Sequence, residues 1–360
     1  MGVTLRTIFA MASAVLIFQP AAGASLPRIN RATVEPLAHV DTAFEELKVP
    51  QGYRLRFIKT RPHGARGRLP AVYFVQWLSC DSVEIGRSED GWTAMLKSLV
   101  RDSGMVVART EKAGVGDSEG GPCSALDYDT ELAHHRLALE RLFSDPWIDP
   151  QRVIVFGASM GANFAPLVAA DHPVKAVAVW GGGAQSWFER QLGFERRTLE
   201  LSGKSGAEID ERMRKLSQFY ARVLLDGQTP AQIAQRDPSL GATWMAVSGA
   251  SGETQFGRPI AFHQQAQHQY WAQAWAALDA PVLALFGQFD WYEAPEGVRL
   301  IGEVVNRAHP GRAQVQIVAG LDHHFMRYAS EADAFADRGG VPDAPAVMSV
   351  LLPWLKQHAN

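Results

Sequence analysis

The chain has 360 residues, of which 47% are hydrophobic and 20% charged, and this composition excludes a disordered, collagen-like or coiled-coil chain. Its 35 basic and 38 acidic residues leave a formal net charge of -3 with no block of like charge, so we expect no nucleic-acid partner. Only two cysteines occur, which excludes a disulfide-dense scaffold and a cysteine-built zinc or iron–sulfur site. The length fits one long domain or two short ones.

The first 24 residues predict a cleaved secretory signal peptide. Arg6 precedes an apolar stretch over residues 7–18, and the small residues Ala22 and Ala24 stand where a signal peptidase reads the chain. About twelve apolar residues are too few to cross a bilayer, and no later stretch is long enough, so we expect no stable membrane insertion. We therefore expect a periplasmic or secreted protein whose mature chain is residues 25–360. Residues 25–36, polar and containing proline, are expected to form a linker.

The next part of the chain predicts a sheet with helices on both faces. Residues 44–49 and 53–59 alternate around Pro-Gln-Gly and predict a hairpin. Short apolar runs then alternate with helix-forming stretches, which is typical of an α/β fold with a mostly parallel sheet. The expected strands are residues 71–75, 105–108, 153–156, 176–180, 282–286 and 315–318, and the expected helices are residues 92–101, 128–143, 162–170, 295–306 and 346–358.

One interval between expected strands is far longer than an ordinary connection. About one hundred residues separate the strands at 176–180 and 282–286, whereas such loops usually have a few residues. The interval contains four helix-forming stretches, at residues 188–201, 208–225, 230–236 and 261–277. We therefore expect a helical insertion over about residues 184–277 within a single α/β domain.

Residues 157–161, Gly-Ala-Ser-Met-Gly, lie between an expected strand and an expected helix. A strand that turns sharply into a helix through G-x-S-x-G holds its serine exposed on a strained corner, here Ser159. The backbone N–H of Met160, at the helix N-terminus, would then point to where an oxyanion forms. A second match at residues 116–120, centred on Ser118, is separated from its strand and leads into Gly-Pro-Cys, which cannot start a helix directly. The context favours Ser159 as the nucleophile.

These motifs, together with residues 114–118 (Gly-Val-Gly-Asp-Ser), make the chain resemble the α/β-hydrolase superfamily. The resemblance is to the serine hydrolases with an inserted helical lid, which include esterases, lipases and proline-iminopeptidase-type peptidases. It covers nearly all of the chain after the signal peptide. Four features occur in the order of that family: a strand leading to the oxyanion loop, the glycine-rich segment, the nucleophile elbow, and a lid after the sixth strand.

The resemblance implies the chain order serine, acid, base. Residues 287–290 follow an expected strand and match the family's G-x-x-D element, which makes Asp290 the acid that orients the base, with Glu293 in the same loop as the alternative. Residues 320–325, Gly-Leu-Asp-His-His-Phe, match the family's G-x-D-H-x-F and place His323 as the base, with the adjacent His324 as the alternative. Surface or capping roles are expected for three other histidines: His134, His135 and His172.

The oxyanion loop departs from the family pattern, because Gln76 and Trp77 stand where His-Gly is usual. The backbone N–H of Leu78 or of Trp77 is expected to act as the second oxyanion donor beside Met160. Trp77 is expected either to line the substrate pocket or to pack in the core.

The resemblance also bears on the two cysteines. In this fold the strands that precede Cys80 and Cys123 are neighbours, so both residues emerge at the same sheet edge near the active site. An exported location permits oxidation. We therefore predict a disulfide between Cys80 and Cys123.

These features predict a serine hydrolase that cleaves a carboxylic ester of a small molecule, or a related acyl bond such as a lactone or thioester, through an acyl-enzyme intermediate. Ser159, His323 and Asp290 are the expected triad. A lidded serine aminopeptidase acting on a short peptide is the alternative, and it would need an acidic lid residue such as Glu195, Glu200 or Glu211. A non-catalytic binding protein with this fold would lack a member of the triad. No H-E-x-x-H motif or phosphate-cradling loop occurs, so no metal and no cofactor is expected. The sequence leaves the oligomeric state open.

Overall fold

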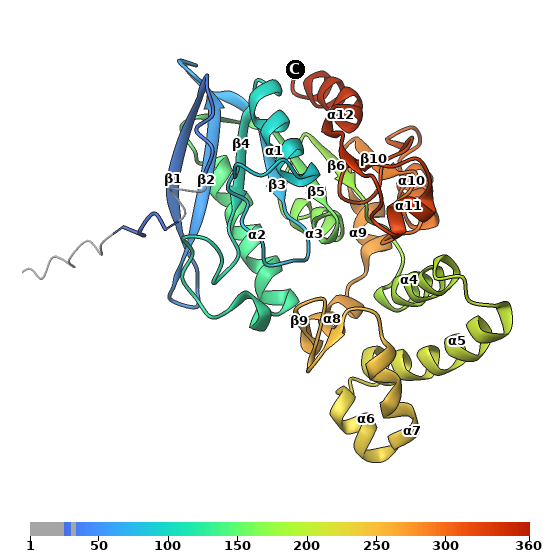
Figure 1. Ribbon diagram of the computed structural model, residues 1–360. Coiled ribbons are helices and arrows are strands. Elements are labelled where there is room, and N and C mark those ends of the chain that lie inside the picture. The colour runs from blue at the N-terminus through green and yellow to red at the C-terminus, as the bar shows by residue number, and fades with distance from the viewer. Residues whose placement is uncertain (1–24, 30–33) are drawn as a thin grey trace, which may run out of the picture.

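The computed structural model describes residues 25–29 and 34–360, and the expected signal peptide lies outside these residues. An eight-stranded sheet with the strand order β1-β2-β4-β3-β5-β6-β10-β11 runs through the molecule (Figure 1). Its strands are β1 (Val40–Lys48), β2 (Arg54–Pro62), β3 (Leu69–Val75), β4 (Val106–Thr110), β5 (Ile148–Ala158), β6 (Ala176–Trp180), β10 (Val282–Gly287) and β11 (Ala313–Val318).

The sheet is antiparallel at one end and parallel over the rest. The hairpin β1–β2 pairs antiparallel, β2 pairs antiparallel with β4, and the strands from β4 to β11 are all parallel. The turn of the hairpin contains Gly52, whose φ of 89° is a conformation that glycine adopts without strain. The α/β class and the mostly parallel sheet expected from the sequence are therefore confirmed.

Helices cover both faces because side chains alternate along the central strands. On β3, Val72 and Phe74 belong to the core beneath α1 (Gly91–Asp102) and α12 (Ala344–His358), which contact each other. Tyr73 and Val75 belong to the other core, beneath α2 (Tyr128–Phe143), α3 (Met160–Ala169), α9 (Trp271–Ala277) and α10 (Pro295–Ala308). All residues of β3 from Ala71 onward are buried, as expected for a strand with two covered faces.

The long interval between β6 and β10 forms a helical insertion that projects from the sheet-bearing body (Figure 1). It contains α4 (Trp187–Leu201), α5 (Gly206–Tyr220), a π-helical turn (Ala221–Leu225), α6 (Pro230–Arg236), α7 (Pro238–Gly241), a 3₁₀ turn (Ala242–Ala246), the short strands β7 (Ala250–Ser251), β8 (Thr254–Gln255) and β9 (Arg258–Pro259), and α8 (Ile260–Gln267). The expected helix at 261–277 is two helices, since the chain leaves helical geometry between α8 and α9. The chain returns to the body at α9, which contacts α3 and α10.

The remaining elements are short. They are a 3₁₀ turn (Cys123–Ala125), β12 (Met326–Arg327), α11 (Glu331–Phe335) and β13 (Val341–Pro342). Within the described residues, no helix has the length and apolar character needed to cross a membrane.

The expectation of a linker over residues 25–36 is wrong for its first described part. Leu26 is buried, and its carbonyl oxygen accepts a hydrogen bond from Arg56 of β2 at 3.0 Å. Arg28 forms ion pairs with Glu84, at 2.6 Å, and with Asp117. The backbone of residues 25–29 and the side chain of Arg28 pair with charged groups of the body, and composition alone does not distinguish this from a solvated linker.

Candidate active site

Ser159 lies at the sharp turn between β5 and α3. Its φ of 57° and ψ of -122° are a strained combination for a residue with a side chain, and its N–H donates to the carbonyl oxygen of Trp180 at 2.8 Å. The flanking glycines are required by space. A Cβ at Gly157 would lie 2.1 Å from the carbonyl oxygen of Gly161, and a Cβ at Gly161 would lie 2.0 Å from that of Val75. The local sequence therefore folds as the nucleophile elbow that it predicts.

Two hydrogen bonds join Ser159 to residues far away in the chain. His323 Nε2 lies 2.8 Å from Ser159 Oγ, and His323 Nδ1 lies 2.7 Å from Asp290 Oδ2. The other oxygen of Asp290 accepts the backbone N–H groups of Tyr292, at 3.0 Å, and Glu293, at 2.9 Å. Asp290 and His323 are buried and follow the carboxyl ends of β10 and β11. The structure thus brings the three expected triad residues together in one hydrogen-bonded chain.

The surroundings of His323 favour its protonated form. Burial by itself would lower the pKa of the imidazole, but the charge and hydrogen bond of Asp290, with Glu293 and Asp322 nearby, outweigh burial and raise that pKa above 6.5. In this geometry the imidazole can accept a proton from Ser159, and the carboxylate of Asp290 would stabilise the imidazolium that forms.

The two alternative triad residues lie in other interactions. Glu293 forms an ion pair with Arg190 of α4 at 2.6 Å and does not contact His323 through a hydrogen bond. His324 Nδ1 lies 3.4 Å from Asp322 Oδ2, and its side chain is 41% exposed.

The second G-x-S-x-G segment forms a turn beside the sheet. Ser118 Oγ accepts the N–H of Arg56 at 2.8 Å, and the neighbouring Asp117 pairs with the Arg56 side chain. Within the described part of the chain no basic side chain is hydrogen-bonded to Ser118, and the segment joins the loop after β4 to β2.

The loop after β3 carries Trp77 and Leu78 toward the N-terminus of α3. Neither of their N–H groups has a hydrogen-bond acceptor among the described residues. Met160 is the first residue of α3, so its N–H has no partner within the helix. The three candidate oxyanion donors are therefore free to bind a ligand oxygen. Trp77 is 7% exposed, and its ring lies 4.5 Å from that of Trp92, so it both packs in the core and lines the pocket described next.

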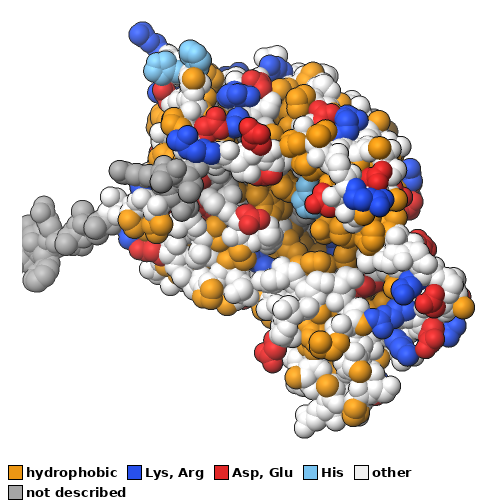
Figure 2. Space-filling model, in the orientation of Figure 1, with side chains coloured by type: hydrophobic (Ala, Val, Ile, Leu, Met, Phe, Trp, Pro, Cys, Tyr) orange, Lys and Arg blue, Asp and Glu red, His pale blue; other side chains and the backbone are white. Residues whose placement is uncertain are grey.

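A small pocket opens over Ser159, with a cavity volume of about 260 Å³. Figure 2 shows the surface hollowed between the sheet-bearing body and the insertion, with hydrophobic side chains around the hollow. The lining residues are mainly aromatic: Trp77, Leu78, Ser79, Trp92, Ser159, Arg190, Phe256, Tyr292, His323 and His324.

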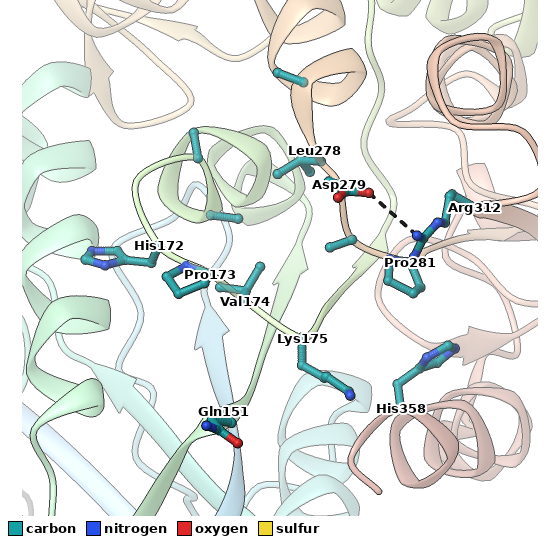
Figure 3. A pocket seen from close by; sticks show the side chains of 14 residues that line it. Gln151, His172, Pro173, Val174, Lys175, Leu278, Asp279, Pro281, Arg312 and His358 are labelled. Carbon is teal, nitrogen blue, oxygen red and sulfur yellow. Dashed lines mark ion pairs between the residues drawn. The ribbon is translucent and has the colours of Figure 1, made fainter.

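A larger hollow of about 630 Å³ lies at the opposite end of the strands (Figure 3). Lys175 and Pro281 line it immediately before β6 and β10, whereas Ser159 follows the carboxyl end of its strand. Arg312 pairs there with Asp279 at 3.6 Å. Its lining contains no hydroxyl or thiol side chain, so it offers no serine, threonine or cysteine nucleophile despite its size.

The predicted disulfide between Cys80 and Cys123 is confirmed, with a Cα–Cα distance of 5.8 Å. It joins the loop after β3 to the loop after β4. Arg258 of β9, in the insertion, reaches the same point and donates to the carbonyl oxygen of Cys123 at 3.2 Å. Arg258 also forms an ion pair with Glu131 of α2.

Buried polar residues near the site were not found from the sequence. Lys112, after β4, donates to the carbonyl oxygens of three consecutive residues of the oxyanion loop. The expectation of surface or capping roles for His134 and His135 is wrong, since both are buried on α2 and lie 3.3 Å and 2.9 Å from the hydroxyl groups of Tyr53 and Tyr73. His172, by contrast, is partly exposed and stacks on Phe143.

The residues near Ser159 are not arranged as a metal site. Across residues 25–29 and 34–360, no group of three or more His, Cys, Asp and Glu side chains is placed to hold a metal ion.

Comparisons with known proteins identify the fold. No protein-family model matches the chain, and no curated protein sequence matches it. Among solved structures, the α/β hydrolase GrgF from Penicillium sp. sh18 is 16% identical with a TM-score of 0.54, over 89% of this chain and 99% of that one. DcsB in complex with its substrate analogue is 14% identical with a TM-score of 0.54 over the same shares. Carboxyl esterase 2 from Tuber melanosporum is 14% identical with a TM-score of 0.52, over 91% of this chain and 88% of that one. The chain has the α/β-hydrolase fold, which confirms the resemblance at the level of the fold.

Proposed function

We propose that the protein is a serine hydrolase that cleaves carboxylic esters through an acyl-enzyme intermediate. The observation that carries the proposal is the hydrogen-bonded chain from Ser159 through His323 to Asp290, at the floor of a pocket. The likeness to esterases and other hydrolases of the same fold supports it. A complete triad also argues against a non-catalytic binding protein.

In the proposed reaction, His323 Nε2 removes the proton of Ser159 as Oγ attacks the ester carbonyl carbon. The oxyanion that forms accepts hydrogen bonds from Met160 N–H and from a second N–H in the oxyanion loop. His323 then gives the proton to the leaving alcohol, and the acyl group stays on Ser159. A water molecule, activated by the same imidazole, releases the acid and restores Ser159.

The lining of the pocket favours an ester over an N-terminal peptide. An aminopeptidase needs a carboxylate facing the α-ammonium group, but none of the lining residues is acidic, and the charged residue that the insertion contributes is Arg190. Glu195 is buried inside the insertion, where it accepts from Tyr220 and Ser248.

The other two acidic candidates also lie elsewhere, because Glu200 and Glu211 are exposed on α4 and α5. A volume of about 260 Å³ is at the low end for ligand pockets, so we infer a compact acyl group.

Export is part of the proposal. The disulfide between Cys80 and Cys123 fits an oxidising compartment, and the first 24 residues have the pattern of a signal peptide. We place the enzyme in the periplasm or outside the cell. Peptide sequencing of protein exported by its host should find Ser25 as the first residue, whereas an intact Met1 would contradict export through a cleaved signal.

The test of the activity is covalent labelling with a fluorophosphonate probe, together with turnover of p-nitrophenyl esters of increasing acyl length and of aminoacyl anilides. Wild-type protein should be labelled and should prefer short-chain esters, and Ser159→Ala should lose both labelling and turnover. Ser118→Ala, in the second G-x-S-x-G segment, is the matched control and should keep both. An unlabelled wild type, or a Ser159→Ala variant with full turnover, would contradict the proposal, and a preference for anilides would replace it with the peptidase.

A further inference from the structure

The ammonium group of Lys112 is buried under the oxyanion loop. Nζ donates to the carbonyl oxygens of Leu78 at 3.0 Å, Ser79 at 2.7 Å and Trp77. An ammonium group has three N–H donors, so every donor of Lys112 is directed at this loop. The side chain is 1% exposed, and water therefore does not compete for these bonds.

These contacts fix the direction of one particular N–H group. The carbonyl oxygen of Trp77 and the N–H of Leu78 belong to the same trans peptide unit, in which the C=O and N–H bonds point in opposite directions. Because Lys112 holds the Trp77 carbonyl, the Leu78 N–H points away from the ammonium group. A donor on the carbonyl oxygen also polarises the peptide and makes its N–H a stronger donor.

Burial lowers the pKa of Lys112 well below 10.5, and the nearby charge of Arg258 acts in the same direction, whereas Asp81 and Glu111 oppose this. Glu131 Oε1 lies 3.4 Å from Lys112 Nζ, but Glu131 is also paired with Arg258. Lys112 and Arg258 therefore share the carboxylate of Glu131. A buried charge must be compensated by nearby dipoles, and the three carbonyl groups of the loop supply them.

The loop starts against the nucleophile elbow. The carbonyl oxygens of Val75 and Gln76 fill the space where a Cβ at Gly161 would lie, at 2.0 Å and 2.8 Å from that position. Leu78 and Ser159 line the same pocket. Leu78, whose N–H points away from Lys112, therefore lies on the wall of the same pocket as the nucleophile.

We propose that Lys112 is a positioning residue that selects the N–H of Leu78, rather than that of Trp77, as the second oxyanion donor. This inference rests on the proposed serine hydrolase activity. Lys112 acts through the peptide group and does not touch the substrate. Residues 76–79, Gln-Trp-Leu-Ser, contain no glycine, and the three hydrogen bonds from Lys112 hold their backbone in place.

The experiment compares Lys112→Met with wild type in the full mature chain, using a short p-nitrophenyl ester and a trifluoromethyl ketone, which forms an oxyanion on the active serine. Each value is expressed per site titrated by the fluorophosphonate. Losing an oxyanion donor affects the transition state more than substrate binding. We expect kcat to fall about 10²-fold and ketone affinity to fall by a similar factor, with KM changed by less than about threefold.

Lys59→Met is the matched control. Lys59 of β2 is also a buried lysine, and it pairs with Asp145 and with Glu45 of β1. Its loss should therefore lower the thermal unfolding midpoint without changing kcat or ketone affinity per titrated site. If Lys112→Met does not fold, Lys112→Gln keeps two N–H donors without the charge and should show a smaller loss of the same kind.

The outcomes separate the two proposals. Wild type that is labelled, together with a folded Lys112 variant of unchanged kcat and ketone affinity, would overturn the role of Lys112 and leave the hydrolase intact. Wild type that is neither labelled nor active would overturn the proposed function and this inference with it.

Discussion

Glu111 is a completely buried carboxyl group in the segment that follows β4, and its ionisation should be visible in the stability of the protein. Ser82 Oγ–H and the N–H of Val83, both in the loop after β3, donate to it. These bonds favour the ionised form, but burial outweighs them and raises the pKa of Glu111 from 4.5 to about 7.

The sign of the pH effect follows from this direction. Between pH 4.5 and about 7 the folded chain holds a proton on Glu111 that the unfolded chain has released, so the contribution to stability is present in full below pH 4.5 and is lost as the pH rises through about 7. The difference of about 2.5 pKa units corresponds to about 3 kcal/mol.

The perturbation is Glu111→Gln, which keeps the shape of the protonated acid. Its amide can donate to Ser82, whose hydroxyl also accepts hydrogen bonds. Urea unfolding of both proteins at intervals between about pH 4.5 and 8.5, with the disulfide intact, gives the free energy of unfolding at each pH. As the pH rises across this range, the free energy of unfolding of the variant should increase relative to that of wild type by up to about 3 kcal/mol.

The control is Glu208→Gln. Glu208 is exposed on α5, and the hydrogen bonds of Ser205 lower its pKa, so its contribution is lost only as the pH falls below 4.5. Above that pH the free energy of unfolding of the control should have the same pH dependence as that of wild type. Parallel curves for wild type and Glu111→Gln would refute the reasoning about Glu111.

Three further predictions concern the proposed active site and its supports. The acylation rate should rise with pH through the pKa of His323, which lies above 6.5, because only the neutral imidazole accepts the serine proton. Asp290→Asn should move this rise to lower pH and reduce kcat by about 10⁴-fold, as measured in a stopped-flow or steady-state ester assay. Gly161→Ala places a methyl group 2.0 Å from a β3 carbonyl oxygen. The resulting displacement of about 1 Å at the elbow should reduce kcat per titrated site by up to about 10²-fold. Unchanged turnover would mean that the elbow accommodates the methyl group without displacing Ser159. Replacing Cys80 and Cys123 together by alanine removes a cross-link between residues 43 positions apart, and it should lower the free energy of unfolding in urea by about 4 kcal/mol. Two titratable thiols in exported wild-type protein would show that the disulfide does not form.

The strands and the elbow could be predicted because their signals are local. Residues 176–180 are β6, as expected, and residues 128–143 are α2, because apolar runs and periodic patterns record burial directly. The glycine at 157 is likewise required by a contact with Gly161, within the motif itself, whereas Gly161 is required by the distant Val75. The acid and the base came from the resemblance, since nothing local to Asp290 or His323 places them beside Ser159.

The buried polar groups could not be predicted, because their partners are distant in the chain. Lys112 binds a loop more than thirty residues earlier, and Arg258, within the insertion, pairs with Glu131 of α2, 127 residues earlier. His134 and His135 were expected at the surface because they are polar residues on a helix. Their hydroxyl partners are Tyr53, in the turn before β2, and Tyr73 of β3. The helical pattern of residues 128–143 carries no information about these distant tyrosines.

The position of the insertion affects how such a protein can diverge. Strands β6 and β10 are hydrogen-bonded neighbours although residues 181–281 separate them, and their outer neighbours β5 and β11 lie outside the insertion. The backbone pairing of the sheet therefore does not depend on α4 to α8. The insertion nevertheless contributes Arg190 and Phe256 to the pocket over Ser159. A change within this one continuous stretch of sequence can therefore alter the pocket wall while Ser159, Asp290 and His323 stay on the same strand ends.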